Sequence, residues 1–309
     1  MKCYLAPMEG ITGYIYRNAY HHMFYPMDKY FTPFLVPNQN WKLKSKELND
    51  VLPEHNEGLN VIPQILTGSE KDFIWIADVL QQFGYHEINL NLGCPSKTVV
   101  TKGKGSGFLS RKEELDHFFD SVFSETTIEL SVKTRIGMES PEEFYELLDI
   151  YNKYPLKELI IHPRIQTDYY NNKPNFDIFE YGLKNSKNPI CYNGNIFTED
   201  DYQQLTRRFE HVDRIMFGRG VIADPGLLQK IFGEKGPQVA KLREFHDKIC
   251  SDYRLIMSGD HNVLFRMKEL WDYLGWQFAD AQKQIKKIKK TKNLQDYMAL
   301  TDALFSECF

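Results

Sequence analysis

The sequence predicts an α/β fold, a (β/α)8 TIM barrel followed by a small all-helical C-terminal domain. Eight short runs of β-branched and apolar residues recur along the chain, and their starts lie 25 to 42 residues apart. Amphipathic stretches separate many of these runs, and polar or glycine residues stand at or near their ends. Eight strands alternating with helices over about 220 residues are typical of a barrel.

The predicted strands are these eight runs, in chain order 3–8, 29–35, 60–66, 87–93, 129–135, 158–164, 189–194 and 214–220. Enzymes with this fold place their chemistry at the C-terminal ends of the strands. A whole series of polar strand ends therefore indicates one shared site. A doubly wound parallel sheet has the same alternation and stays the alternative, although it usually has fewer strands.

Helix signals fall between the strands. Residues 71–83 and 140–151 are amphipathic, and the second stretch begins with Ser140 as the expected N-cap and Pro141 at the first helical position. The segment Thr198-Glu-Asp-Asp201 resembles a capping box and predicts the start of another helix.

The strand pattern stops near residue 237, at a segment with two glycines and a proline. The remaining chain indicates helices at 239–253, 263–278 and roughly 280–304. We therefore predict a barrel domain over residues 1–237 and a helical domain over residues 238–309.

The 309-residue chain has 42% hydrophobic and 26% charged residues, which excludes disordered and low-complexity classes. Its net charge of −4 divides into −6 for residues 1–237 and +2 for residues 238–309. Six lysines stand within residues 283–292. They form either a solvated helix face or a contact to a phosphate backbone, so the net charge does not exclude an RNA partner.

No run of about 18 apolar residues occurs, so no membrane-spanning helix is expected. The first residues lack a signal-peptide pattern. The five cysteines are widely spaced and include no CxxC pair, so we expect neither a disulfide framework nor a metal site, and a cytoplasmic location. Cys3 and Cys191 lie within strands and are expected to be inert core residues.

Two glycine-containing loops follow the seventh and eighth strands, where barrels often bind phosphate. The first contains Asn193, Gly194 and Asn195, and the second contains Gly218 and Arg219. Glycine lets backbone N–H groups approach an anion, and arginine supplies a permanently charged fork. We therefore predict a phosphorylated cofactor at these loops.

Three more polar residues end strands. Lys133 and His162 end the fifth and sixth strands, and Gln64 lies near the end of the third. A lysine inside a barrel mouth must be paired or desolvated. A flavin satisfies this requirement, because a cation near N1 stabilises the anionic reduced ring. The amide of Gln64 can donate and accept at once, which suits the pyrimidine edge of that ring.

The segment Asn91-Leu-Gly-Cys94-Pro95 comes just after the fourth strand. Its glycine and proline favour a tight turn, so the Cys94 thiol is expected to project over the barrel mouth. The following loop, residues 97–107, is basic and rich in glycine but matches neither a P-loop nor the dinucleotide-binding motif. We expect Cys94 to be functional rather than an inert core residue.

Together these segments resemble the FMN-dependent tRNA-dihydrouridine synthase family. The matching segments, from residue 5 to residue 271, are Leu5-Ala6-Pro7-Met8-Glu9-Gly10, Pro63-Gln64-Ile65, 89–95, Val132-Lys133-Thr134-Arg135, Ile161-His162-Pro163-Arg164, 193–196, Gly218-Arg219-Gly220 and 265–271. The Asn-x-Gly-Cys-Pro segment together with the Lys-x-Arg and His-x-Arg strand ends is specific. Glu9-Gly10 and the arginine–lysine spacing near Trp271 favour the bacterial subgroup that acts on D-loop position 16.

The resemblance implies reduction of the uracil C5–C6 double bond in tRNA, with FMN and NADPH. Cys94 would be the catalytic acid that protonates C5 after hydride reaches C6. The predicted flavin contacts, including those that the resemblance implies, are Pro7, Met8, Glu9, Gln64, Lys133, His162, Asn193, Gly194, Asn195, Gly218 and Arg219. The candidate substrate contacts are Asn91, Lys97, Lys104, Arg135, Arg164, Arg266 and Lys268. We expect a monomer whose partners are tRNA and NADPH.

Three positions depart from the family pattern, which often has Asp at position 195, Gly at position 163 and His at position 269. Asn195 keeps a side chain that forms hydrogen bonds. Glu269 carries the wrong charge for a phosphate contact in the helical domain.

Alternatives to tRNA reduction remain. A flavin barrel acting on a free pyrimidine, like the dihydroorotate dehydrogenases, would need neither the helical domain nor its lysines. Ribosomal RNA is a closer variant of the substrate. A non-catalytic RNA-binding factor would not need Cys94, Lys133 and His162 together.

Overall fold

The computed structural model of the chain describes residues 1–38 and 40–307. These residues form two compact units. The first unit comprises Met1–Pro7, Asp28–Gly194 and Arg208–Met216, and the second comprises Met8–Met27, Asn195–Arg207 and Phe217–Phe309. The domain boundary expected near residue 237 stays a prediction.

Within the described residues, nine strands form one sheet in the order β3-β2-β1-β9-β8-β7-β6-β5-β4. The strands are β1 (Lys2–Leu5), β2 (Lys29–Phe31), β3 (Val61–Ile62), β4 (Gln64–Ile65), β5 (Glu87–Leu92), β6 (Glu129–Arg135), β7 (Leu159–His162), β8 (Ile190–Asn193) and β9 (Arg214–Phe217). Each predicted run contains one strand, except 60–66, which contains two. The predicted barrel with helices in the C-terminal region is confirmed.

The barrel closes at Pro63. The strands β3 and β4 stand at opposite ends of the strand order, yet this one residue separates them in the chain. β3 pairs in parallel with β2, and β4 pairs in parallel with β5. Proline has no N–H for a strand ladder, but the Pro63 carbonyl still accepts the N–H of Asn89 at 2.9 Å. One continuous segment therefore pairs on both of its edges, and the nine strands make an eight-stranded barrel.

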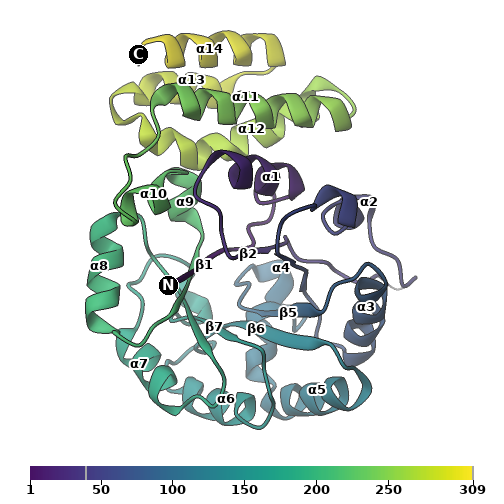
Figure 1. Cartoon of the computed structure of the whole chain (residues 1–309). Coiled ribbons are helices and arrows are strands. Elements are labelled where there is room, and N and C mark those ends of the chain that lie inside the picture. Colours follow the sequence, from purple (N-terminus) through teal and green to yellow (C-terminus); the bar gives the residue numbers. More distant parts are fainter. Residues whose placement is uncertain (39, 308–309) are drawn as a thin grey trace. The chain divides into compact units, whose positions relative to one another are not determined.

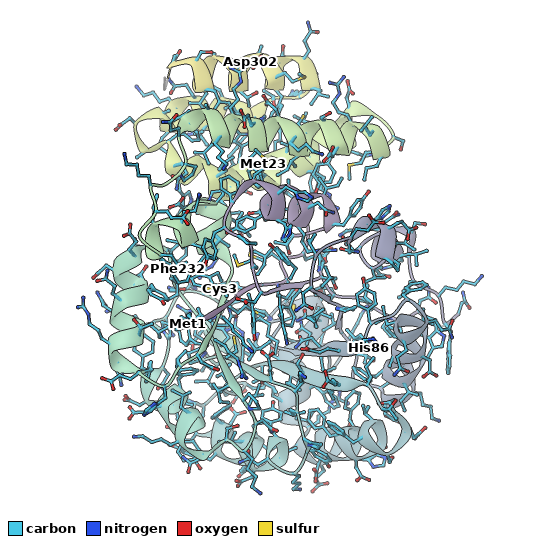
Figure 2. The ribbon with its side chains drawn as sticks, in the orientation of Figure 1. Met1, Cys3, Met23, His86, Phe232 and Asp302 are labelled. Carbon is cyan, nitrogen blue, oxygen red and sulfur yellow. The ribbon has the colours of Figure 1, made fainter. Side chains whose placement is uncertain are left out.

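Buried side chains fill the first unit. One core cluster consists of Tyr4, Ala6, Phe31, Ile62, Ile160, Cys191 and Met216. Cys3, labelled in Figure 2, is buried too, as its strand position predicts. Burial raises the pKa of the Cys3 thiol to about 12 and that of Cys191 well above its ordinary value. Both thiols therefore stay protonated at neutral pH, whereas Cys308 lies outside the described residues.

Helices follow the strands around the outside of the first unit (Figure 1). The longer ones are α3 (Glu70–Gln82), α5 (Lys112–Glu125), α6 (Glu143–Tyr151) and α7 (Phe176–Asn185), and the short turns in the loops are α2 (Ser45–Asn49), η1 (Pro53–His55), α4 (Lys97–Val100), η2 (Gly105–Ser110) and η3 (Gln166–Asp168). The longer helices pack in sequence, α3 on α5, α5 on α6 and α6 on α7. Each buries its apolar face, as the amphipathic pattern predicts.

The helix α6 begins later than its sequence predicts. Its N-cap is Glu142, so the prediction of Ser140 as the N-cap is wrong. The Glu143 carboxylate accepts hydrogen bonds from the three backbone N–H groups of residues 138–140 at 2.8 to 3.0 Å. The N–H groups of residues 143, 144 and 145 bond to the carbonyls three residues earlier, at 3.1 to 3.3 Å, so this first turn is tight and the regular helix begins after it.

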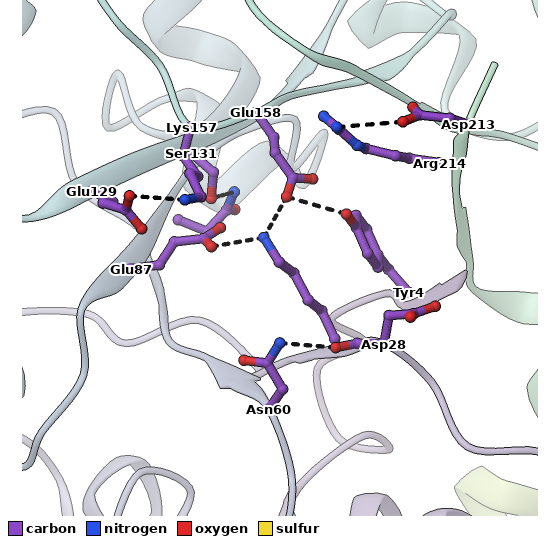
Figure 3. Close-up of polar contacts among 12 residues, drawn as sticks. Tyr4, Asp28, Asn60, Glu87, Glu129, Ser131, Lys157, Glu158, Asp213 and Arg214 are labelled. Carbon is purple, nitrogen blue, oxygen red and sulfur yellow. Dashed lines mark hydrogen bonds and ion pairs between the residues drawn. The ribbon is translucent and has the colours of Figure 1, made fainter. Parts of the chain in front are cut away.

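A cluster of charged side chains lies at the N-terminal ends of the strands (Figure 3). The Lys29 ammonium, on β2, pairs with the carboxylate of Glu87 on β5 at 2.7 Å and with that of Glu158 just before β7. The Tyr4 hydroxyl, on β1, donates to Glu158 at 3.1 Å. A cavity of about 790 Å³ opens beside these side chains. The cluster joins four strands at the end of the barrel that is opposite to Gln64.

The second unit is helical. Its elements are α1 (Tyr14–Met23), most of α8 (Glu199–Arg208), α9 (Arg219–Ala223), α10 (Leu227–Ile231), α11 (Val239–Ile256), α12 (Asp260–Leu274), η4 (Gly275–Gln277), η5 (Ala279–Ala281), α13 (Gln282–Lys290) and α14 (Leu294–Glu307). The Tyr16 and Phe24 rings pack edge-on against Phe245, which joins α1 to α11. Asp302, labelled in Figure 2, pairs with Arg243 at 2.6 Å. No helix in the described part of the chain is long and apolar enough to cross a bilayer.

Side-chain caps set two helix starts in the second unit. The capping box before α8 is confirmed, because Thr198 Oγ1 accepts from the Asp201 N–H at 3.1 Å and the Asp201 carboxylate accepts from the Thr198 N–H at 3.0 Å. The expectation of one helix over roughly 280–304 is wrong. Asn293 accepts the Asp296 N–H at 2.8 Å and starts α14 as a separate helix after α13.

A buried polar chain joins α11, α12 and α14. The Trp271 indole N–H donates to the Tyr297 hydroxyl at 2.7 Å, and this hydroxyl lies 2.6 Å from His246 Nε2. His246 Nδ1 lies 2.8 Å from the Asp247 carboxylate. Because indole only donates and carboxylate only accepts, the hydroxyl donates to Nε2 and the ring proton is on Nδ1. All four polar groups are thereby satisfied.

Candidate active site

Amide side chains form a ladder at the C-terminal ends of β4 and β5. Asn91 Nδ2 donates to Gln64 Oε1 at 2.7 Å, and Gln64 Nε2 donates to Asn89 Oδ1 at 2.8 Å. Asn89 Nδ2 in turn donates to Ser131 Oγ at 3.0 Å. All four residues are buried. The ladder fixes the orientation of the Gln64 amide, and one of its two N–H groups has no partner among the described residues.

Cys94 is held in a turn by Asn91. The Asn91 Oδ1 atom accepts the backbone N–H groups of Gly93 at 3.0 Å and Cys94 at 2.9 Å. The Cys94 carbonyl accepts the N–H and the hydroxyl of Ser106 at 3.1 and 2.8 Å. Gly105 has φ +57°, and a Cβ there would lie 2.9 Å from this carbonyl, so the close approach requires glycine. The half-buried Cys94 therefore has a well-defined backbone position, and its thiol forms no disulfide.

Lys133 lies beside this turn, because it is the register partner of Asn91 in the parallel pair of β5 and β6. Burial, with a smaller contribution from the charge of Arg135, lowers the pKa of the Lys133 ammonium to about 8. No carboxylate pairs with Lys133 within residues 1–38 and 40–307. A desolvated cation of this kind is suited to a ligand that carries negative charge.

Arg135 and Arg164 hold one loop in place. The buried Arg135 guanidinium donates to three backbone carbonyls, those of Gly93 at 2.9 Å, Ile165 at 2.8 Å and Tyr169 at 2.6 Å. The buried Arg164 donates to the carbonyl of residue 172 at 2.5 Å. Both arginines thus bind the segment 165–172, and their predicted contact with a substrate stays a prediction.

His162 lies next to Arg164. Arg164 Nη1 is 2.8 Å from His162 Nε2. A guanidinium only donates, so Nε2 accepts, the His162 ring is neutral and its proton is on Nδ1. The ring of Tyr170 lies 6.0 Å from the His162 ring, and Tyr170 also packs on the Arg135 guanidinium. Arg164 therefore sets the tautomer of His162.

Several residues of this site were not singled out in the sequence. Asn89 and Ser131 extend the amide ladder, and alternation along their strands is the signal that would have found them, since both point inward with Gln64. Gln166 Nε2 donates to the carbonyl of Pro95 at 3.1 Å and joins the segment 165–172 to the Cys94 turn. Tyr170 stands about half exposed on that segment, and nothing local in its sequence marks it.

The remaining predicted residues of the first unit stand at strand ends. Pro7 follows β1 and is half-buried. The Asn193 side chain, at the end of β8, donates to the carbonyl of Met216 at 2.9 Å. A Cβ at Gly194 would lie 2.1 Å from the Tyr192 hydroxyl, so this position requires glycine.

Asn195 and Arg219 come together in the second unit. Arg219 Nη2 donates to Asn195 Oδ1 at 2.9 Å, and Gly218 precedes α9 as its N-cap residue. A Cβ at Gly220 would lie 1.8 Å from the carbonyl oxygen of Ile196, so the two predicted phosphate loops touch at a glycine. Within the second unit, the segment that begins at Asn195 therefore lies next to the segment of Gly218 and Arg219.

Two basic residues of the helix α12, Arg266 and Lys268, bond to other groups of the protein. Arg266 donates to the carbonyl of Gly10 at 3.2 Å and pairs with the Glu269 carboxylate at 2.8 Å. Lys268 donates to the carbonyl of Thr291, just after α13. The RNA contacts predicted for both residues stay predictions. Glu269, at a position where the resemblance would have placed histidine, is the partner of Arg266.

Four more predicted site residues are Met8, Glu9, Lys97 and Lys104. Met8 begins a turn in which its carbonyl accepts the N–H groups of residues 11 and 12 at 3.1 and 3.0 Å, and Glu9 is exposed in that turn. Lys97 is exposed in α4, and Lys104 is half-buried just before η2. Their predicted contacts stay predictions.

Comparison with known proteins agrees with this geometry. The family model described as dihydrouridine synthase (Dus) matches residues 4–304. A tRNA-dihydrouridine synthase B of Pasteurella multocida is 26% identical over 74% of this chain and 68% of its own length. A tRNA-dihydrouridine(16) synthase of Vibrio parahaemolyticus is 24% identical over 94% of this chain and 92% of its own.

Solved structures with the same fold include a morphinone reductase, with 12% identity, a TM-score of 0.53 and 77% of this chain and 87% of that chain covered. A variant of NCR from Zymomonas mobilis has 14% identity, a TM-score of 0.52 and covers 78% of this chain and 90% of that one. These likenesses concern the fold. The family model covers nearly the whole sequence, and the chain belongs to the dihydrouridine synthases, a family of FMN-dependent oxidoreductases.

Proposed function

We propose that this protein reduces the C5–C6 double bond of uridines in tRNA to dihydrouridine, with FMN as cofactor and NADPH as the source of electrons. The observation that carries the proposal is the placement of Cys94 and Lys133. They lie at the ends of adjacent parallel strands, close enough to interact electrostatically. A proton donor and a desolvated cation then face the same end of the barrel.

The residues of the first unit fit a flavin ring. Lys133 offers a desolvated ammonium, which stabilises negative charge on the pyrimidine edge of the reduced ring. Gln64, held by the amide ladder, offers an N–H to the same edge. Bound FMN supplies the hydride that adds to uracil C6.

The other proposed flavin contacts line the ring and hold the ribityl phosphate. In the second unit, Asn195 orients the Arg219 guanidinium beside Gly218, and this set suits a phosphate. The further contacts are Pro7, Met8, Glu9, His162, Asn193 and Gly194. The neutral His162 ring can donate through Nδ1, which suits a carbonyl rather than a phosphate.

Cys94 acts as the acid. After hydride addition at C6, the uracil carries negative charge and needs a proton at C5. The Cys94 thiol donates this proton, becomes a thiolate and is reprotonated from water. A thiol with a reference pKa of about 8.5 holds its proton at neutral pH, and a positioned acid contributes about 10²- to 10⁴-fold to a rate. Asn91 keeps the thiol in place through its two bonds to the turn.

The substrate is a uridine of tRNA that leaves its stack to reach the flavin. We assign it to position 16, because the Vibrio parahaemolyticus relative named for that position aligns with 94% of this chain. Lys97 and Lys104 contact the RNA directly. Four other basic residues can contact the RNA only if they first break the hydrogen bonds to backbone carbonyls described above. They are Arg135, Arg164, Arg266 and Lys268.

The test incubates the FMN-loaded protein and NADPH with tRNA that lacks dihydrouridine, and analyses the nucleosides by position. Dihydrouridine at position 16 is expected. Cys94→Ala should lower the rate about 10²-fold or more at unchanged FMN content. A wild-type rate in Cys94→Ala would contradict the acid assignment. Flavin reoxidation by free uracil or orotate as fast as by tRNA would contradict the substrate.

A further inference from the structure

One exposed tryptophan of the second unit stands out. Trp276, in η4 between α12 and α13, has 56% of its surface exposed. One face of its ring stacks on Phe197, with centroids 5.5 Å apart and planes 25° apart. The exposure therefore belongs to the opposite face and the edges of the indole. Single exposed apolar side chains are common on protein surfaces, so the fixed stack beneath this ring carries more weight than its exposure.

The position of Trp276 is fixed on both sides. Gly275 lies so close to α13 that a Cβ there would be 2.9 Å from the Ile285 side chain. On the other side, Gln277 Nε2 donates to the carbonyl of Ala223 in α9 at 3.0 Å. With Phe197 beneath the ring, the indole has little freedom. A rigid aromatic face loses little conformational entropy when a flat ligand stacks on it.

Cationic side chains lie on two elements near Trp276, although Asp272 and Asp280 are exposed close to it in the sequence. The Arg219 guanidinium lies over the Phe197 ring, 5.5 Å from its centre, so the same phenyl ring contacts both the cation and the indole. The helix α13, on which Gly275 packs, has exposed lysines. The exposed lysines of α13 and the residues after it are Lys283, Lys286, Lys287, Lys289, Lys290 and Lys292. Of these lysines, only Lys289 forms an ion pair with another described residue, and its partner is Asp272.

We propose that Trp276 is a stacking platform for an unpaired base of the tRNA substrate, and that the α13 lysines contact the adjoining phosphates. This inference rests on the proposed function. An aromatic face beside a lysine-rich surface is the combination that binds single-stranded nucleic acid, because every base has a π-face and every nucleotide a negative charge. The lysines favour RNA over an apolar or a basic protein partner.

The test measures tRNA binding by the FMN-loaded protein. Trp276→Ala should raise the Kd for tRNA by about 5- to 150-fold, the range expected for one lost base stack, and Trp276→Phe should recover part of the affinity. The KM for tRNA should rise by the same factor while kcat is retained. Binding of tRNA should quench tryptophan fluorescence in the wild type, and Trp276→Phe should lose most of this quenching.

A lysine variant separates stacking from charge. The double change Lys286→Gln and Lys287→Gln should reduce the slope of log affinity against log salt by about 1.4 to 1.8, while Trp276→Ala should leave the slope unchanged. Tyr145→Ala is the matched control, since Tyr145 is also exposed and packs on another tyrosine, Tyr181, but stands among glutamates on α6. It should leave tRNA binding unchanged.

Two outcomes overturn the inference. One is a Trp276→Ala variant that binds tRNA like the wild type. The other is loss of FMN or a lowered melting temperature in Trp276→Ala that accounts for the lost affinity, because Trp276 would then act only through Phe197 and Arg219. If the wild type makes dihydrouridine, either result refutes the platform alone. If the wild type neither binds nor reduces tRNA, the proposed function fails with it.

Discussion

At the scale of single residues, buried amides and arginines decide what the polar residues do. The Asn91 side-chain oxygen accepts a hydrogen bond from the backbone of the Cys94 turn, and its N–H donates to Gln64. One side chain therefore positions both the proposed acid and a proposed flavin contact. Arg164 sets the tautomer of His162 in the same way. Groups that look like separate ligand contacts in the sequence are joined by hydrogen bonds in the structure.

The charge of Lys133 should appear in the pH dependence of the reaction. Burial and Arg135 lower its pKa to about 8, so the ammonium is present below this pH and lost above it. The value of kcat/KM for tRNA should therefore fall as pH rises through about 8. Lys133→Arg keeps the charge at all these pH values and should remove this fall. An unchanged fall in Lys133→Arg would assign it to another group, such as the Cys94 thiol.

At the scale of elements, short polar signals set where helices start. The capping box before α8 acts as its sequence suggests, whereas the tight first turn after Ser140 makes α6 begin later than predicted. Asn293 starts α14 and divides a stretch that is amphipathic throughout. The strand run 60–66 is divided too, at Pro63, because its two halves pair with different neighbours. Periodicity finds such segments, and side-chain caps or backbone pairing divide them.

The polar chain between α11, α12 and α14 gives a stability prediction. Tyr297→Phe removes the hydroxyl that accepts from Trp271 and donates to His246, and leaves two buried polar groups without their partner. The free energy of unfolding should fall by about 1–3 kcal/mol. Urea unfolding measures it, with Tyr145→Phe on the surface as the control. A change of less than about 0.5 kcal/mol would mean that these hydrogen bonds make no net contribution to the free energy of unfolding.

At the scale of the whole molecule, the barrel has a different chemistry at each end of its strands. Amides, Cys94 and Lys133 stand at the C-terminal ends, where the family's reaction is proposed. The N-terminal ends carry the ion cluster of Lys29, Glu87 and Glu158, with two acids for one base (Figure 3). Burying these charges costs desolvation free energy, so the cluster affects the stability of the barrel.

This cluster predicts a pH dependence of stability. Burial raises the pKa of the Glu87 carboxyl, against the opposing effect of Lys29, while the unfolded chain has a pKa of about 4.3. The stability that the protonated carboxyl contributes is complete below the unfolded value and is lost as pH rises through the folded value. Glu87→Gln should remove this loss, so its free energy of unfolding should increase relative to wild type between about pH 4.5 and about pH 7.

The measurement is urea unfolding at both pH values. Glu129→Gln is the matched control, because Glu129 also pairs with a lysine, Lys157, but on the surface. That pair should change stability by less than about 1 kcal/mol. If Glu87→Gln and wild type differ by the same amount at both pH values, the cluster does not titrate in this range.

The sequence by itself determined the barrel, its eight strand runs and the residues that end them, because β-branched runs and strand-end polarity are local properties. It also determined the family through the segments around Cys94, Lys133 and His162. Only the tertiary structure decided that Pro63 closes the barrel, that Arg135 and Arg164 hold a loop and that Glu269 pairs with Arg266. The physical reason is that a buried donor or acceptor must find a partner, and the partner comes from whichever distant segment the fold brings next to it.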